Sequence, residues 1–298
     1  VPLATLSQGE IEGVRERFAD ALFGDQDPAL SPSALNRDDY LRRAVTGGYP
    51  EVVTRSGPGR RARWFGSYLT TLIQRDLRDI AAIDHTAAIP GLLRLLAART
   101  AGLANVLDIS RDARLPNTTL TRYLGMLEAL YLFEPLRPWS ANLTTRLARS
   151  PKLFLSDSGL TAYLTDATAE RAARQPETAG PLLEAFALGE IRRQLSWSDR
   201  QPSVFFFRTH QGEEVDIVLE QRDGTVAGIA IKAAARIQPS DLRGLQFLRD
   251  RLGARFVRGI VLYTGEQVLP AGDRLWAMPM EALWRWQADH ITHSTVEI

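Results

Sequence analysis

In the first third of the chain, stretches in which apolar residues recur with helical spacing alternate with polar breaks. Apolar residues recur every three or four positions, the period of an amphipathic helix, in residues 8–22, 64–80 and 89–98. The breaks are polar and contain Pro or Gly, and they cover residues 24–39, 47–53 and the basic stretch 55–63. We therefore expect residues 1–98 to form a helical region in which 55–63 is a turn or linker.

Residues 99–165 show a helix, a short turn and a second helix that begins at Asn117. The apolar stripe of the second helix consists of Leu120, Leu124, Leu127 and Leu130. Two strands are expected next, at 131–136 and 152–156, with a basic polar loop between them. This order predicts a winged helix-turn-helix, whose second helix would present Thr118, Thr119 and Arg122 to a DNA groove. Because many winged helices bind proteins, both kinds of partner stay open.

Residues 178–298 change to a pattern that mixes helical and extended segments. Residues 165–180 are small and polar, which is typical of a linker. The segments that follow predict helix 182–197, strands 203–209, 214–221 and 226–233, helix 239–253, strand 255–265 and a closing helix at 280–286. The order αβββαβ predicts an α/β sandwich around a mixed sheet, so the whole chain is expected to be a multidomain α/β protein.

Composition narrows the class of protein. The 298 residues are 45% hydrophobic and 24% charged, which suits two or three folded domains and excludes bulk disorder. Cysteine is absent, which excludes a disulfide scaffold, a thiolate metal site and a cysteine nucleophile. No apolar run reaches the ~20 residues that span a bilayer, so we expect no membrane partner and a cytoplasmic protein. The first residue is Val and no phosphate-binding P-loop occurs, so we expect a longer parent protein.

Charge is distributed unevenly although the net charge is only +1. Residues 42–160 carry a net charge of +8, against −5 for residues 1–41 and −2 for residues 161–298. Clustered positive charge attracts phosphates regardless of sequence, so the middle of the chain is expected to contact DNA. The residues expected at phosphates are Arg60, Arg61 and Arg63, together with Arg146, Arg149 and Lys152 on or beside the wing. An ordinary solvated surface is the alternative.

Lysine is scarce in this chain, and its two positions are therefore informative. Of the 36 basic residues only Lys152 and Lys232 are lysines. A compact ammonium differs from a guanidinium in shape and hydration, so each lysine is expected where arginine does not serve. For Lys152 the sequence leaves two roles open, a phosphate contact or a salt bridge that fixes Asp157.

Residues on one helix and two strands of the C-terminal segment predict a site for chemistry. Glu214 and Asp216 share one face of the second predicted strand, Lys232 and Ala230 share a face of the third, and Glu184 lies on the preceding helix. Carboxylates can hold Mg²⁺, the metal can activate water, and a lysine can stabilise developing negative charge. This combination predicts phosphodiester hydrolysis, and an acidic turn beside one lysine is the alternative.

Several motifs carry a wider resemblance. GGYPEVV, WFGSYLTTLIQRDL, TTLTRYLGMLEALYLFEPLRPW, SPKLFLSDSGLTAYL, LLEAFALGEI and the pair RTHQGEEVDIVLEQ and GIAIKAA occur in order. Together, over residues 40–285, they resemble the bacterial and archaeal AAA-type ATPases that carry domain of unknown function 4143. The last segment resembles the PD-(D/E)XK, or restriction-endonuclease-like, nucleases. The resemblance implies an upstream ATPase domain that would bind ATP, and a homo-oligomer is a possible state of such proteins.

The resemblance also assigns roles to residues. Asp216 matches the motif aspartate, Lys232 the motif lysine, Glu184 the helix acid, and Gln246 a glutamine of some branches. Mg²⁺ or Mn²⁺ would be held by Asp216, Glu184 and the backbone of Ile231.

The third strand departs from the family pattern, because Ala230 stands where a second metal-binding glutamate is usual. The chain is then either a naturally degenerate nuclease or one whose glutamate was replaced. Without a glutamate at position 230, Asp216 is the only carboxylate left of the usual metal-binding pair, and it would hold the metal poorly. The sequence thus predicts a DNA-binding, nuclease-like portion of an ATPase with impaired cleavage, in which Ala230→Glu would restore activity. The competing hypothesis is a non-catalytic interaction or regulatory module of the ATPase.

Overall fold

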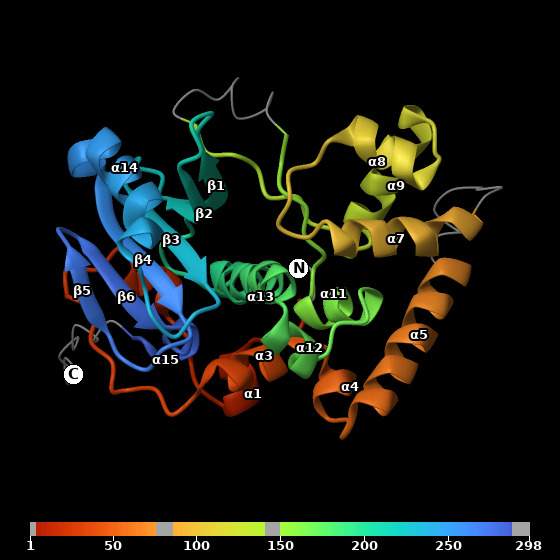
Figure 1. The fold of residues 1–298 in the computed structure, drawn as a ribbon, viewed down its shortest axis with the longest axis horizontal. Coiled ribbons are helices and arrows are strands. Elements are labelled where there is room, and N and C mark those ends of the chain that lie inside the picture. The colour runs from red at the N-terminus through yellow and green to blue at the C-terminus, as the bar shows by residue number, and fades with distance from the viewer. Residues whose placement is uncertain (1–3, 76–85, 141–149, 288–298) are drawn as a thin grey trace, which may run out of the picture.

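The computed structural model describes residues 4–75, 86–140 and 150–287, and Figure 1 shows its ribbon. The first part of the chain is helical. Its helices are α1 (Gln8–Glu12), α2 (Phe18–Ala21), α3 (Arg37–Thr46), α4 (Pro50–Val53), α5 (Pro58–Gln74), η1 (Thr86–Ala88), α7 (Ile89–Ala98), α8 (Val106–Ala113), α9 (Asn117–Ala129), α11 (Ser158–Leu164) and α12 (Ala169–Arg174).

The C-terminal part contains a mixed sheet with helices on both faces. Its elements are α13 (Pro176–Leu195), β1 (Ser203–Arg208), β2 (Glu214–Glu220), β3 (Val226–Lys232), η2 (Pro239–Leu242), α14 (Arg243–Leu252), η3 (Gly253–Arg255), β4 (Phe256–Tyr263), β5 (Leu269–Gly272), β6 (Leu275–Pro279) and α15 (Ala282–Arg285). The strand order is β1-β2-β3-β4-β6-β5, with parallel pairs only at β3–β4 and β4–β6. The predicted α/β class is thereby confirmed.

The two faces of the sheet are covered by different helices (Figure 1). On one face the strand residues Ile217, Ile229 and Ile260 pack in the same buried cluster as Leu183 and Phe186 of α13. On the other face Val218, Val226 and Val261 pack with Leu245 and Leu248 of α14. The strands are therefore apolar on both sides, as buried strands between two helical layers must be.

A separate core lies in the helical half. It unites residues of α5, α7, α8, α9 and α11, and the predicted stripe of α9 contributes Leu120 and Leu127, which are fully buried. Helices α2 and α3 do not join this core. Their residues Phe18, Tyr40 and Leu41 pack with the C-terminal sheet and α13.

The segments after α9 are extended and connect the two halves. Phe133 bridges Leu155, Leu136 bridges Lys152, and Leu103 also bridges Lys152. These contacts are isolated bridges at the positions where the sequence predicts two strands. Pro138 then bridges Phe206 of β1, so the same extended chain reaches the edge of the large sheet.

Several predicted boundaries are wrong, each for a local reason. The helix expected over 8–22 is broken into α1 and α2, because Gly13 adopts a left-handed conformation with φ +71° and caps α1. The linker expected at 55–63 becomes helical at Pro58, which occupies the first turn of α5. The linker expected at 165–180 contains α12, whose N-cap Thr168 accepts a hydrogen bond from the Arg171 amide. Strands β5 and β6 were not expected.

In the parts of the chain that the structure describes, every helix is too short or too polar to cross a membrane.

Gly244, at the start of α14, allows this helix to approach β2 where the acidic residues of β2 lie. A Cβ on Gly244 would lie 1.8 Å from the backbone oxygen of Glu214, so one of the two elements would have to move. A Cβ on Gly125, in the exposed part of α9, would have no heavy atom within 4 Å.

We predict that Gly244→Ala lowers the free energy of unfolding by ~2 kcal/mol or more, because overpacking displaces α14 from β2. Gly125→Ala is the matched control, and it should raise stability by up to ~1 kcal/mol because alanine favours a helix over glycine. Denaturant unfolding of both variants checks this, and equal effects would contradict the close approach.

Candidate functional site

Three carboxylates from two elements converge at the end of the sheet that carries the β1–β2 hairpin. Glu184 comes from α13, and Glu214 and Asp216 come from β2. A β-bulge directs them. The pairing of β1 with β2 shifts between Phe205↔Val218 and Phe207↔Val215, so two residues of β2 face one residue of β1. In a regular strand Asp216 would share the face of Val218, which packs on the α14 side, but the extra residue allows Asp216 to lie on the α13 side together with Ile217.

The ammonium of Lys152 lies in the middle of these carboxylates. Its Nζ is 2.7 Å from Glu184 Oε1, 2.7 Å from Glu214 Oε1 and 3.6 Å from Asp216 Oδ1. It also lies 5.5 Å from the centre of the buried Phe206 ring. The lysine side chain is only 3% exposed, so this is a buried charge whose partners are almost all carboxylate oxygens.

The backbone around Lys152 holds the ammonium in place. The Lys152 amide donates to the Leu136 carbonyl at 2.8 Å, and the Leu136 amide donates to the Lys152 carbonyl at 3.0 Å. Lys152 thus belongs to the extended segment of the helical half, whereas its partners belong to α13 and β2. A compact ammonium can donate to separate oxygens in different directions, which a planar guanidinium cannot do in the same space.

Burial and charge determine the protonation of the cluster. Burial raises the pKa of Glu184 and the negative charge of Asp216 acts in the same direction, whereas the positive charge of Lys152 lowers it. Burial also raises the pKa of Asp216, against the attraction of Lys152. Burial alone would lower the pKa of Lys152, but Glu184 and the other two carboxylates outweigh it and the pKa is raised. Lys152 therefore stays charged at neutral pH.

Lys232 and Ala230 lie elsewhere than the sequence predicts. Lys232 is 38% exposed and pairs with Asp241 of η2 at 3.4 Å, on the α14 side of the sheet. Ala230 is buried on that same side, among Val218, Leu245 and other apolar residues. The expectation that the Cβ of Ala230 faces the acidic cluster is therefore wrong, because the bulge in β2 directs Asp216 to the opposite side.

The remaining predicted ligands also differ. The backbone of Ile231 was expected to help hold a metal. Its amide N–H instead donates a hydrogen bond to Asp216 Oδ2 at 2.7 Å. Gln246 lies on α14, across the sheet from Glu184. Within residues 4–75, 86–140 and 150–287, no group of three or more His, Asp or Glu side chains is arranged to hold a metal ion. The three carboxylates are arranged around an ammonium, and they do not fit Mg²⁺ or Mn²⁺.

The predicted nucleic-acid contacts fall into three groups. Thr118, Thr119 and Arg122 lie in the first half of α9, with Thr118 and Arg122 exposed. Arg60 and Arg63 are exposed on α5, whereas Arg61 donates to Thr46 Oγ1 at 2.8 Å and to the Arg55 carbonyl at 3.0 Å. Arg146 and Arg149 lie outside the described residues. Lys152 is buried in the acidic cluster and does not lie on a phosphate-binding surface.

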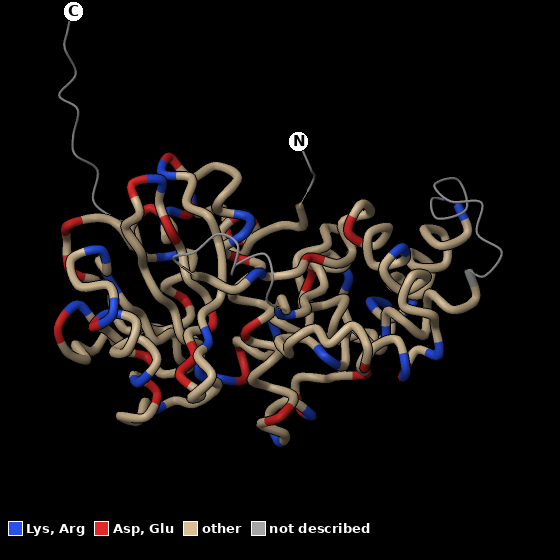
Figure 2. Tube along the Cα trace, turned by 90° about the horizontal axis from the view of Figure 1, so that it is seen from above, with Lys and Arg blue, Asp and Glu red and all other residues tan. Residues whose placement is uncertain are grey.

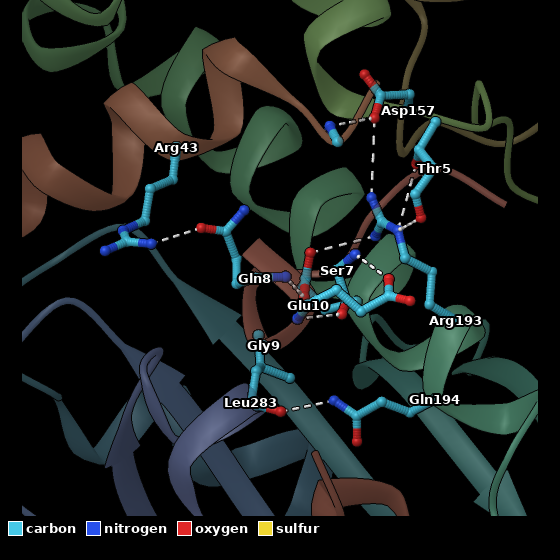
Figure 3. A network of polar contacts seen from close by, with 12 residues as sticks. Thr5, Ser7, Gln8, Gly9, Glu10, Arg43, Asp157, Arg193, Gln194 and Leu283 are labelled. Carbon is cyan, nitrogen blue, oxygen red and sulfur yellow. Dashed lines mark hydrogen bonds and ion pairs between the residues drawn. The ribbon is translucent and has the colours of Figure 1, made fainter. Parts of the chain in front are cut away.

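The salt bridge expected between Lys152 and Asp157 is not formed, because Lys152 pairs with Glu184, Glu214 and Asp216. Asp157 belongs instead to a second buried polar network (Figure 3). Arg193 of α13 lies 3.8 Å from Asp157 Oδ2, donates to Glu190 Oε1 at 3.2 Å and donates to the Thr5 carbonyl at 2.8 Å. Glu190 in turn accepts from the Gln8 amide at 2.8 Å.

Asp157 also accepts from the Gly48 amide at 2.8 Å. The network thus joins the first residues of the described chain, α11 and α13. The sequence pattern does not predict this network, because Glu190 and Arg193 are spaced like an ordinary surface pair on a helix. The apolar residues on every side of α13 were the available signal.

Comparison with known families adds to this geometry. Residues 179–283 match the domain of unknown function DUF4143. Residues 37–171 match a second domain of unknown function, DUF8612. The acidic residues of the cluster fall in the first match and Lys152 in the second. The ionic cluster therefore joins two segments that match different families.

Two curated relatives are similar to the chain at a distance. They are the uncharacterized protein Rv2008c of Mycobacterium tuberculosis and the uncharacterized protein Mb2031c of Mycobacterium bovis. Each is 27% identical over 239 residues, which cover 80% of this chain and 52% of the relative. The chain thus spans about half the length of the curated relatives it matches. No solved structure matches it.

We predict that Glu190 makes stability depend on pH. Burial raises the pKa of Glu190 from 4.5 to about 7. Because the folded chain then binds the proton more tightly than the unfolded chain, this contribution is fully present below about pH 4.5 and is lost as the pH rises through about 7. Thermal melts from acid to neutral pH should therefore show the melting temperature of Glu190→Gln rising relative to wild type.

The control for this experiment is Glu51→Gln, at an exposed position. Its difference from wild type should stay constant over the same pH range. A constant difference for Glu190→Gln as well would contradict the role of Glu190.

We also predict that Ala230→Glu destabilises the chain by ~2–4 kcal/mol and gives no Mg²⁺- or Mn²⁺-dependent DNA cleavage, because it buries a carboxylate among apolar residues. Ala234→Glu, at an exposed position, should change stability little. Denaturant unfolding and a plasmid cleavage assay check both variants. Cleavage by Ala230→Glu that disappears on adding Asp216→Ala would contradict the position of Ala230 in the structure.

Proposed function

We propose that this chain is a DNA-binding, nuclease-like module that does not cleave DNA and belongs to a larger ATPase-type protein. The observation that carries the proposal is the basic helical half, in which a helix–turn–helix presents an exposed polar end. The absence of cleavage follows from the arrangement of the acidic residues around Lys152.

The order of elements in the helical half supports a winged helix. It runs from α7 through the bridge at Leu103 to α8 and α9, and then to the extended segments that carry Phe133, Leu136 and Lys152. In a winged helix the second helix of the helix-turn-helix enters the major groove. That helix would be α9, which exposes Thr118, Thr121 and Arg122 near its start.

The charge of the same half supports a polyanionic partner. Residues 58–75 and 86–129 contain nine Arg but only three Asp or Glu. Arg99 pairs with Asp112 and Arg111 with Asp108, which neutralises part of this charge. The other exposed arginines include Arg60 and Arg63 on α5, Arg94 on α7, Arg114 after α8 and Arg122 on α9. Figure 2 shows that basic positions outnumber acidic ones in this half of the molecule.

The C-terminal half supports the nuclease-like part of the proposal. The order α13-β1-β2-β3-α14-β4 is the αβββαβ order of the PD-(D/E)XK resemblance, with β5, β6 and α15 added after it. The carboxylates that would hold a metal bind Lys152 instead, so the fold would serve as a scaffold. ATP binding would belong to an ATPase domain in the longer protein.

A second candidate function is a docking module for a protein. Among the described residues, four of the six large exposed apolar side chains lie in the helical half: Leu103, Val106, Leu107 and Tyr131 are 43%, 40%, 66% and 56% exposed. Apolar groups of this kind favour a protein partner, because a DNA backbone offers them no apolar contact. Binding that does not depend on salt would favour this candidate.

We predict that the chain binds duplex DNA with an affinity that falls steeply between about 50 and 200 mM salt. Replacing both Arg60 and Arg63 by Ala should reduce the slope of log affinity against log salt by ~2, because two phosphate contacts are lost. Fluorescence anisotropy with a labelled duplex measures the slope.

The matched control removes two exposed arginines from the C-terminal half, Arg200→Ala with Arg222→Ala. This variant should keep the wild-type slope. No binding at low salt, or equal slopes for the two double variants, would overturn the DNA-binding proposal.

A further inference from the structure

The acidic cluster contains a cation that is part of the chain. We propose that the Lys152 ammonium is the permanent counter-cation of Glu184, Glu214 and Asp216, that it takes the place of a divalent metal there, and that removing it converts the three carboxylates into a divalent-cation site. This inference deepens the proposed nuclease-like module but does not depend on DNA binding.

Distances support a site fitted to an ammonium. The contacts of 2.7, 2.7 and 3.6 Å from Lys152 Nζ suit N–H donors to carboxylates. Mg²⁺ binds oxygen at ~2.0–2.1 Å and Ca²⁺ at ~2.3–2.6 Å, so a metal would require the carboxylates to move inward. They cannot do so around an ammonium that already lies between them.

The charges in the cluster support the proposal that a divalent cation binds when Lys152 is removed. Three carboxylates surround one lysine, and among the described residues Arg208 also pairs with Glu214, at 3.5 Å from Oε2, with its side chain 47% exposed. Removing Lys152 would leave the half-buried carboxylates without their central positive charge. Carboxylate oxygens are the ligands that hard divalent cations prefer, so such a cation is the natural replacement.

Lys152 and its carboxylate partners come from different halves of the molecule. Lys152 lies on the extended segment that bridges Leu103 and Leu136 in the helical half, whereas the carboxylates lie on α13 and β2. The ammonium therefore ties the two halves together in addition to neutralising the acids. A metal bound in its place would neutralise the acids without tying this segment to them.

The test compares wild type with Lys152→Met, which keeps the length and apolar stem of the side chain. Both proteins are stripped with a chelator, and melting temperature and calorimetric binding are measured with MnCl₂, MgCl₂ and CaCl₂. Wild type should show no change in melting temperature. Lys152→Met should melt lower, recover with cation, and bind Mn²⁺ at least ~100-fold more tightly than wild type.

A neutral variant is the control. Lys152→Met combined with Glu184→Gln and Asp216→Asn removes two of the three carboxylate charges together with the lysine and leaves Glu214 with Arg208, so it should regain stability and lose the response to cations. If Lys152→Met is insoluble on its own, cation added during refolding should recover it.

Two results would overturn the proposal. One is wild-type protein that binds Mn²⁺ as tightly as Lys152→Met. The other is a Lys152→Met protein, folded or refolded with cation, that gains no stability from any of the three metals. Because neither readout involves DNA, failure here is distinguishable from failure of the DNA-binding proposal.

Discussion

The contact between the Lys152 ammonium and three carboxylates is the interaction on which the arrangement of the two halves depends. The lysine comes from the extended segment after α9, and its partners come from α13 and β2. A buried ion pair contributes little net stability relative to apolar groups of the same shape, but loss of one partner is costly because a buried charge then stays unpaired. The cluster thus favours one arrangement of the halves over others.

The Arg193 network supports the same junction from the C-terminal end of α13, whereas Glu184 lies near the middle of this helix. Arg193 and Glu190 bind the chain at Thr5 and Gln8, and Asp157 at the start of α11 binds Gly48. Both buried ionic groups therefore use α13 as a common support, and the apolar faces of α13 pack between α3 and the sheet. Because α13 makes specific polar contacts at two sites and apolar contacts elsewhere, both its position and its rotation about its own axis are fixed.

Periodicity predicted the fold better than it predicted the site. The helical repeat located α7, α8, α9, α13 and α14, and the extended runs located β1 to β4, because these elements bury regular apolar faces. Strands β5 and β6 were missed because they are short and contain Pro and Gly, which indicate turns. The linkers expected at 55–63 and 165–180 proved helical because Pro58 and Thr168 begin helices there.

At the site, sequence spacing identified Glu184, Glu214 and Asp216, and the structure brings them together. It assigned the wrong lysine, because strand alternation assumes a regular ladder and the bulge in β2 moves Asp216 away from the face of Ala230 and Lys232. The scarcity of lysine was the better signal. It marked Lys152 as unusual, but only the long-range pairing with Leu136 shows where the ammonium lies.

With two lysines in the chain, the central claim can be tested directly by nitrogen-detected NMR of the side-chain amines after selective ¹⁵N-lysine labelling. We expect one signal, lost in Lys152→Met, to be a protonated ammonium protected from hydrogen exchange, and the exposed Lys232 to exchange rapidly. Adding Mn²⁺ should leave the Lys152 signal unbroadened, because no cation enters the cluster. Rapid exchange at both lysines, or loss of the Lys152 signal on addition of Mn²⁺, would contradict the account.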